Sequence, residues 1–66
     1  MKIVVEIQKT ESLAITPPTI YDNDNQAEAA YHTALSAAAV STVPVHSVVM
    51  LNEIGELVKR QTYYHQ

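Results

Sequence analysis

Residues 31–46 read YHTALSAAAVSTVPVH, and they run from the second half of a predicted helix into the start of a strand. The helix is expected to begin at Asn23, whose side chain suits an N-cap, and to continue to about Ala39, because alanine is the best helix former. Pro44 follows and cannot continue it. Because alanine is small, this helix can lie close to a sheet or to a second helix across a dimer. Five residues at helical spacing are expected to pack inward: Ala27, Tyr31, Ala34, Leu35 and Ala38.

A β-hairpin is predicted before the helix. Residues 1–8 alternate, with three β-branched residues on one face that is expected to be buried and Val4 on the other, outer face. Residues 13–16 resume the alternation, with Leu13 and Ile15 expected to face the core. Pro17 and Pro18 then make this strand a sheet edge, or end it before a restart near residues 19–21.

A second hairpin is predicted after the helix. Residues 45–51 form a strand that is apolar on both faces, so the alternation leaves open which face is buried. Residues 52–55 read NEIG, a turn with Asn first and Gly fourth, and residues 56–64 form the last strand. The expected fold is α+β, a ββαββ chain whose single helix packs on one face of a four-stranded, mainly antiparallel sheet. Residues 1–66 form one domain.

Charge and composition disfavour several classes of partner. The net charge is −3, whereas a nucleic-acid binder usually carries a basic stripe. Weak nucleic-acid binding through Lys2, Lys59 and Arg60 is kept only as an alternative. No stretch approaches the roughly 18 apolar residues of a membrane span. We therefore expect a soluble, cytoplasmic protein with neither nucleic acid nor a membrane as its partner.

Residues for catalysis or metal binding are sparse. The three histidines, His32, His46 and His65, match no zinc spacing, and the chain has no cysteine. His32 is expected to be solvated and His65 to lie in a disordered terminus. We predict no catalytic residue, no metal and no cofactor, and hence no enzyme. The alternative is a small-ligand or catalytic module that uses His46 with a neighbouring tyrosine.

An excess of apolar side chains is the stronger signal. Hydrophobic residues make up 47% of the chain, and one helix covers only one face of a sheet. The uncovered side chains would form an interface, so we expect a homodimer that also contacts an unidentified protein partner. The candidate interface residues are Val4, Val45, Val49, Leu51, Tyr63 and Tyr64.

Several segments also carry a resemblance. The sequence EAAYHTAL at residues 28–35, SAAAVS at 36–41 and PVHSVVML at 44–51, with VEIQK near the start and YYH near the end, is similar to a family of short, uncharacterised proteins of Gram-positive bacteria and their prophages. This resemblance implies a small cytoplasmic or phage-associated accessory protein. It implies no catalytic residue, because the family has no assigned activity.

Overall fold

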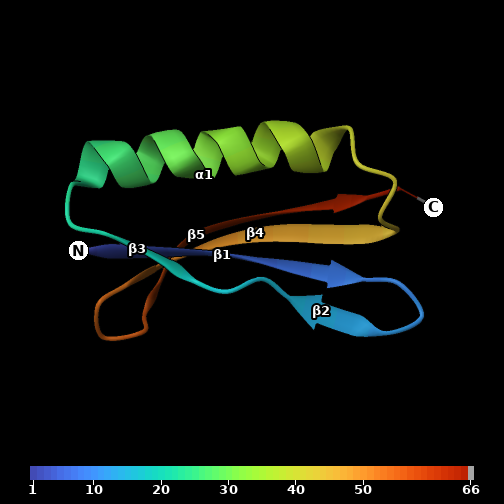
Figure 1. The fold of residues 1–66 in the computed structure, drawn as a ribbon, viewed down its shortest axis with the longest axis horizontal. Coiled ribbons are helices and arrows are strands. Elements are labelled where there is room, and N and C mark those ends of the chain that lie inside the picture. The colour runs from blue at the N-terminus through green and yellow to red at the C-terminus, as the bar shows by residue number, and fades with distance from the viewer. Residues whose placement is uncertain (66) are drawn as a thin grey trace.

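A helix lies on one side of an antiparallel sheet in the computed structural model, which describes residues 1–65 (Figure 1). The strand order is β2-β1-β4-β5, and β3 pairs with β1 on the same side as β2. The expected α+β class, with one helix on a sheet, is therefore confirmed. The elements are β1 (Lys2–Lys9), β2 (Leu13–Ile15), β3 (Thr19–Tyr21), α1 (Asp24–Ala39), β4 (Val45–Asn52) and β5 (Leu57–Tyr64).

The sheet has five strands where four were expected, because two prolines split the edge strand into β2 and β3. Proline has no backbone N–H to donate to a ladder, so pairing with β1 stops at Pro17 and Pro18 and resumes at β3. Thr16 extends the first half. Its backbone N–H donates to the carbonyl of Glu6 at 2.9 Å, and its Oγ1 accepts from the Glu6 N–H at 2.9 Å.

The ends of α1 are closed by side chains. The Oδ1 of Asn23 accepts from the backbone N–H groups of Asn25 and Gln26 at 2.8 and 3.2 Å, so the predicted N-cap is confirmed. At the other end, Nε2 of His65 donates to the carbonyl of Ala38 at 2.8 Å. His65 therefore has a structural contact, and the expectation that it lies in a disordered terminus was wrong.

The core lies between α1 and the two central strands. Its buried residues come from β1, β4 and the inner face of the helix: Val4, Ala27, Tyr31, Ala38, Val48 and Met50. The expectation that Val4 lies on the outer face was wrong, because its side chain is only 8% exposed and packs under α1. The other β-branched residues of β1 occupy the opposite face, which no element within residues 1–65 covers (Figure 1).

The connection from β3 through α1 to β4 decides which face the helix covers. Both strands pair antiparallel with β1, so they run parallel to each other and the helix forms a crossover between them. This crossover is right-handed (Figure 1), as about 98% of such connections are. Given this strand order, the right-handed sense of the crossover places α1 over Val4, Val48 and Met50.

Candidate functional site

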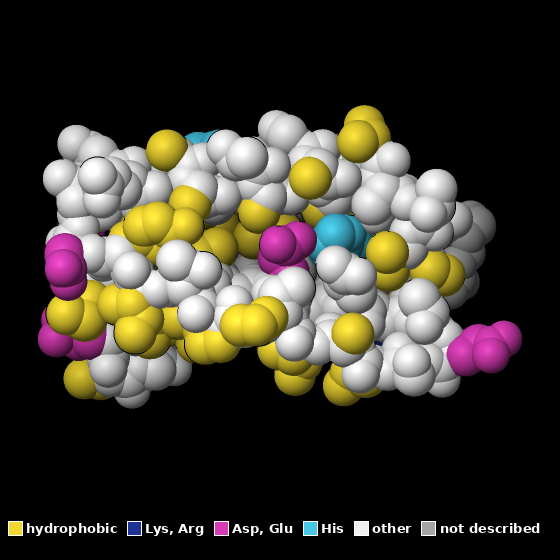
Figure 2. Space-filling model, in the orientation of Figure 1, with side chains coloured by type: hydrophobic (Ala, Val, Ile, Leu, Met, Phe, Trp, Pro, Cys, Tyr) yellow, Lys and Arg dark blue, Asp and Glu magenta, His cyan; other side chains and the backbone are white. Residues whose placement is uncertain are grey.

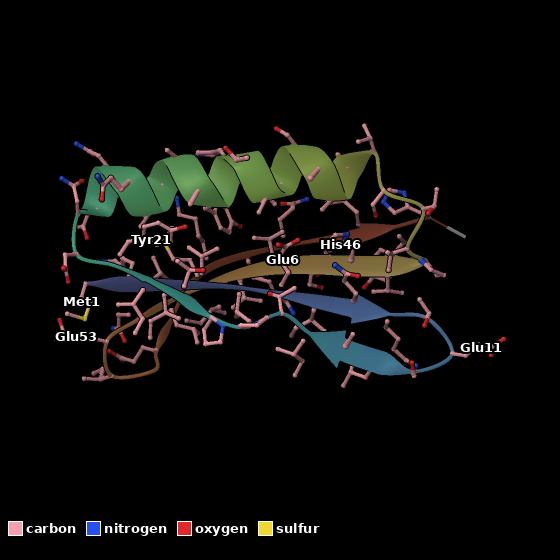
Figure 3. All side chains as sticks on the ribbon, in the orientation of Figure 1. Met1, Glu6, Glu11, Tyr21, His46 and Glu53 are labelled. Atoms are coloured by element: carbon pink, nitrogen blue, oxygen red, sulfur yellow. The ribbon has the colours of Figure 1, made fainter. Side chains whose placement is uncertain are left out.

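A buried polar cluster joins β1, β4 and the loop after α1. The ring of His46 is 4% exposed. Its Nε2 lies 2.8 Å from Oε1 of Glu6 (Figure 3). Its Nδ1 lies 3.0 Å from Oγ of Ser41. Glu6 and His46 are both on the helix-facing side of adjacent strands, because Glu6 pairs in register with Val48 and His46 with Gln8.

The bonding of this cluster assigns the histidine tautomer. A carboxylate only accepts hydrogen bonds, so Nε2 of His46 carries the proton donated to Glu6. In the neutral ring Nδ1 then accepts from the hydroxyl of Ser41. A serine, a histidine and a carboxylate linked in this order have the connectivity of a hydrolytic triad. Whether Ser41 could act as a nucleophile depends on the groups around it.

The surroundings of Ser41 do not suit acyl transfer. Ser41 follows directly after the C-terminal end of α1, where the helix dipole is negative and opposes a developing oxyanion. Its own N–H donates to the carbonyl of Ala38 at 3.3 Å, and the N–H of Val43 points at Oγ of Ser41 at 3.4 Å. Neither group is therefore free to stabilise an oxyanion, and no pocket opens on the surface formed by residues 1–65. The geometry instead suits a clamp that ties the α1–β4 loop to β1.

The remaining histidines do not join this cluster. His32 is exposed on α1 and lies 3.5 Å from a carboxylate oxygen of Glu28, in agreement with the predicted solvated position. His65 stacks on Tyr63 with ring centroids 6.2 Å apart. Within the described part of the chain no group of three potential ligands is close enough to hold a metal. Tyr63 pairs with His46 in register, yet the hydrogen bonds of His46 go to Glu6 and Ser41.

The second candidate is the sheet face opposite α1, called here the uncovered face. No helix lies on it (Figure 1), and hydrophobic side chains gather along the lower margin of the space-filling view (Figure 2). Its polar residues are Lys9, Ser47, Arg60 and Thr62. The registers place the side chains on it, since directly paired residues of antiparallel strands point the same way. Its apolar residues are Ile3, Val5 and Ile7 of β1, Leu13 and Ile15 of β2, Ile20 of β3, Val45, Val49 and Leu51 of β4, and Leu57 and Tyr64 of β5.

The candidate interface residues divide between the two faces. Val45, Val49, Leu51 and Tyr64 lie on the uncovered face, whereas Val4 and Tyr63 lie on the helix side. The residues that sequence reasoning missed are the apolar residues on the outer strands. The expectation that Leu13 and Ile15 face the core was wrong, because their register with β1 places them on the face opposite α1. These missed residues are Leu13, Ile15, Ile20 and Leu57, each about 60% exposed.

The basic residues do not form one patch. Nζ of Lys2 lies 3.3 Å from Oδ1 of Asp24, and Nζ of Lys59 lies 2.6 Å from Oε1 of Glu28. Both lysines are on the helix side. Arg60 pairs with Val49 and therefore points to the uncovered face. The three residues considered for nucleic-acid binding thus separate onto opposite faces of the sheet.

Comparison of the chain with protein-family models, with curated proteins and with solved structures gives no match. Among the described residues, no helix is both long enough and apolar enough to cross a membrane. The function has to be argued from the site itself.

Proposed function

We propose that this protein is a small, non-catalytic interaction protein that contacts another protein chain through the uncovered face. The observation that carries the proposal is the apolar character of that face across β2, β3, β1, β4 and β5. Contiguous apolar patches of more than a few hundred Å² are rare on monomers and usually mark interaction sites. The proposal extends to a cytoplasmic accessory role in Gram-positive bacteria or their prophages, on the resemblance described above.

The polar cluster supports the non-catalytic part of the proposal. Its serine is held at the negative end of a helix, and the nearby backbone N–H groups already have acceptors. Labelling with a fluorophosphonate tests this directly. No labelling of Ser41 is expected. Labelling that is lost in a His46→Ala variant that remains folded would show an activated serine and contradict the proposal.

Site-specific photo-crosslinking tests the interaction role. A benzoylphenylalanine replaces Tyr64 on the uncovered face or, as the control, the exposed His32 on α1. Illumination of cells that naturally produce the protein should give covalent protein adducts at position 64 and few at position 32. Equal yields at the two positions, or none at position 64, would contradict an interaction role for this face.

A further inference from the structure

We infer that the occupant of the uncovered face is a second copy of this chain, packed sheet to sheet with the two helices outside. The inference rests on the proposed function and names the partner. It follows from the size, the shape and the charge of the face.

The size of the face reaches the minimum area of a biological interface. The sheet is four strand positions wide, since β2 and β3 share one edge, and its long strands β1, β4 and β5 have eight residues each. At about 4.8 Å between strands and about 3.4 Å per residue, the face measures about 19 by 27 Å, or about 500 Å². Two such faces bury about 1,000 Å² together, which is about the area that a biological interface should reach.

The shape of the face favours a sheet over a helix as its cover. A partner helix as long as α1, with 16 residues, would measure about 24 by 10 Å and leave about half of the face in water. A second sheet of the same dimensions covers the whole face at the ordinary spacing of about 10 Å between packed sheets. The second copy supplies a sheet of these dimensions with no other protein required.

The charges around the face are compatible with self-packing. Within residues 1–65, its charged residues are Lys9, at the exposed end of β1, and Arg60, on the edge strand β5. Both lie at the periphery, where long side chains can keep their charged ends in water. All seven Asp and Glu carboxylates lie on the helix side, on α1 or in connecting segments. On the two central strands the face carries no charge apart from Lys9, and Arg60, opposite Val49, lies on the outer strand β5. A centre without charge is characteristic of the buried part of a protein interface.

The most exposed apolar side chains on opposite edges provide the test. Ile15 on β2 is 61% exposed and Leu57 on β5 is 60% exposed, so neither contributes much to the core of one chain. Ile15→Lys and Leu57→Lys are compared with Val40→Lys, a control at the end of α1 whose wild-type side chain is 83% exposed. Circular dichroism establishes that each variant is folded.

Sedimentation equilibrium from low micromolar to millimolar concentration should show a wild-type species of twice the 7.3 kDa chain mass. A two-fold dimer contains each substitution twice, so each face variant should raise the dissociation constant by about 20- to 400-fold. Val40→Lys should leave it unchanged. A wild-type protein that stays monomeric at millimolar concentration, or a control that is weakened as much as the face variants, would overturn the inference.

A second measurement needs no variant. With a soluble gadolinium chelate as the probe, the methyl signals of Val5 and Val49 should be broadened less at high than at low protein concentration. Equal broadening at both concentrations would also overturn the inference. The crosslinking experiment separates the two proposals. Adducts at position 64 that never have twice the chain mass would refute the second copy alone, whereas the absence of adducts at position 64 would refute the interaction role itself.

Discussion

Removing the carboxylate of Glu6 should destabilise the fold through His46. In a Glu6→Ala variant, the Nε2–H of His46, a residue that is 4% exposed in the wild-type chain, loses its acceptor. The variant breaks the 2.8 Å link between β1 and β4 side chains and leaves the backbone ladder between these strands in place.

The magnitude follows from the burial of the donor. A buried donor without a partner costs about 1–3 kcal/mol, and hydrogen bonds to charged groups fall in the upper part of that range. We therefore expect a loss of about 2 kcal/mol in the free energy of unfolding. For a domain of this size that corresponds to a fall in Tm of about 8–16 °C. Glu6→Gln keeps an acceptor oxygen in place and should lose less than about 1 kcal/mol.

Urea unfolding followed by circular dichroism at neutral pH measures these differences. The protein concentration must be the same for all variants, because self-association adds to the apparent stability. Glu11→Ala, in the exposed β1–β2 turn, is the control and should stay within about 0.5 kcal/mol of wild type. The reasoning is refuted if Glu6→Ala matches this control, or if Glu6→Gln loses as much as Glu6→Ala.

Two further predictions concern the core and a turn. Burial raises the pKa of Tyr31 above its ordinary 10.0, although Lys59 nearby acts in the opposite direction. The neutral phenol is therefore favoured in the folded state, so its contribution to stability is fully present below pH 10.0 and is lost as the pH rises through the folded pKa. Thermal unfolding at increasing alkaline pH should show a steeper loss of Tm for wild type than for Tyr31→Phe, and parallel losses would contradict this assignment. Gly55 has φ +86°, and a Cβ added there would meet no atom within 4 Å, so Gly55→Ala should cost about 1–2 kcal/mol from backbone strain alone. Gly55→Asn should cost less, because asparagine tolerates left-handed geometry, and equal losses in urea unfolding would count against backbone strain as the cause.

Local signals in the sequence were sufficient for the helix and the turns. The N-cap at Asn23 and the end of α1 at Ala39 depend on residues within one or two helical turns, and both were predicted correctly. The 52–55 turn was also predicted. Asn52 Oδ1 accepts from the N–H groups of Ile54 and Glu56, and Gly55 takes the left-handed conformation. The prolines indicated the break between β2 and β3, although not that both segments remain paired with β1.

The polar cluster of Glu6, His46 and Ser41 could not be predicted from the sequence. Glu6 and His46 are 40 residues apart, and their contact depends on the register between β1 and β4. In the sequence, His46 could only be placed at the start of a strand. The alternation does place Glu6 on the same face of its strand as Val4, and His46 on the same face as Val48 and Met50. This pattern points to a contact between Glu6 and His46 only once it is known that both faces lie under the helix.

The sequence by itself determined the single helix, the strands before and after it except for the split of the edge strand into β2 and β3, and an excess of apolar residues over what one helix can cover. It did not determine which surface stays uncovered. The alternation of β4 is ambiguous because this strand is apolar on both faces, and the alternation of β1 indicated the wrong face, since its more apolar side, with Ile3, Val5 and Ile7, lies opposite α1. The tertiary structure decided this through the right-handed crossover from β3 to β4, which places α1 over Val4, Val48 and Met50. The opposite face, with Val5 and Val49 on its central strands, stays uncovered because residues 1–65 form no second helix to lie on it.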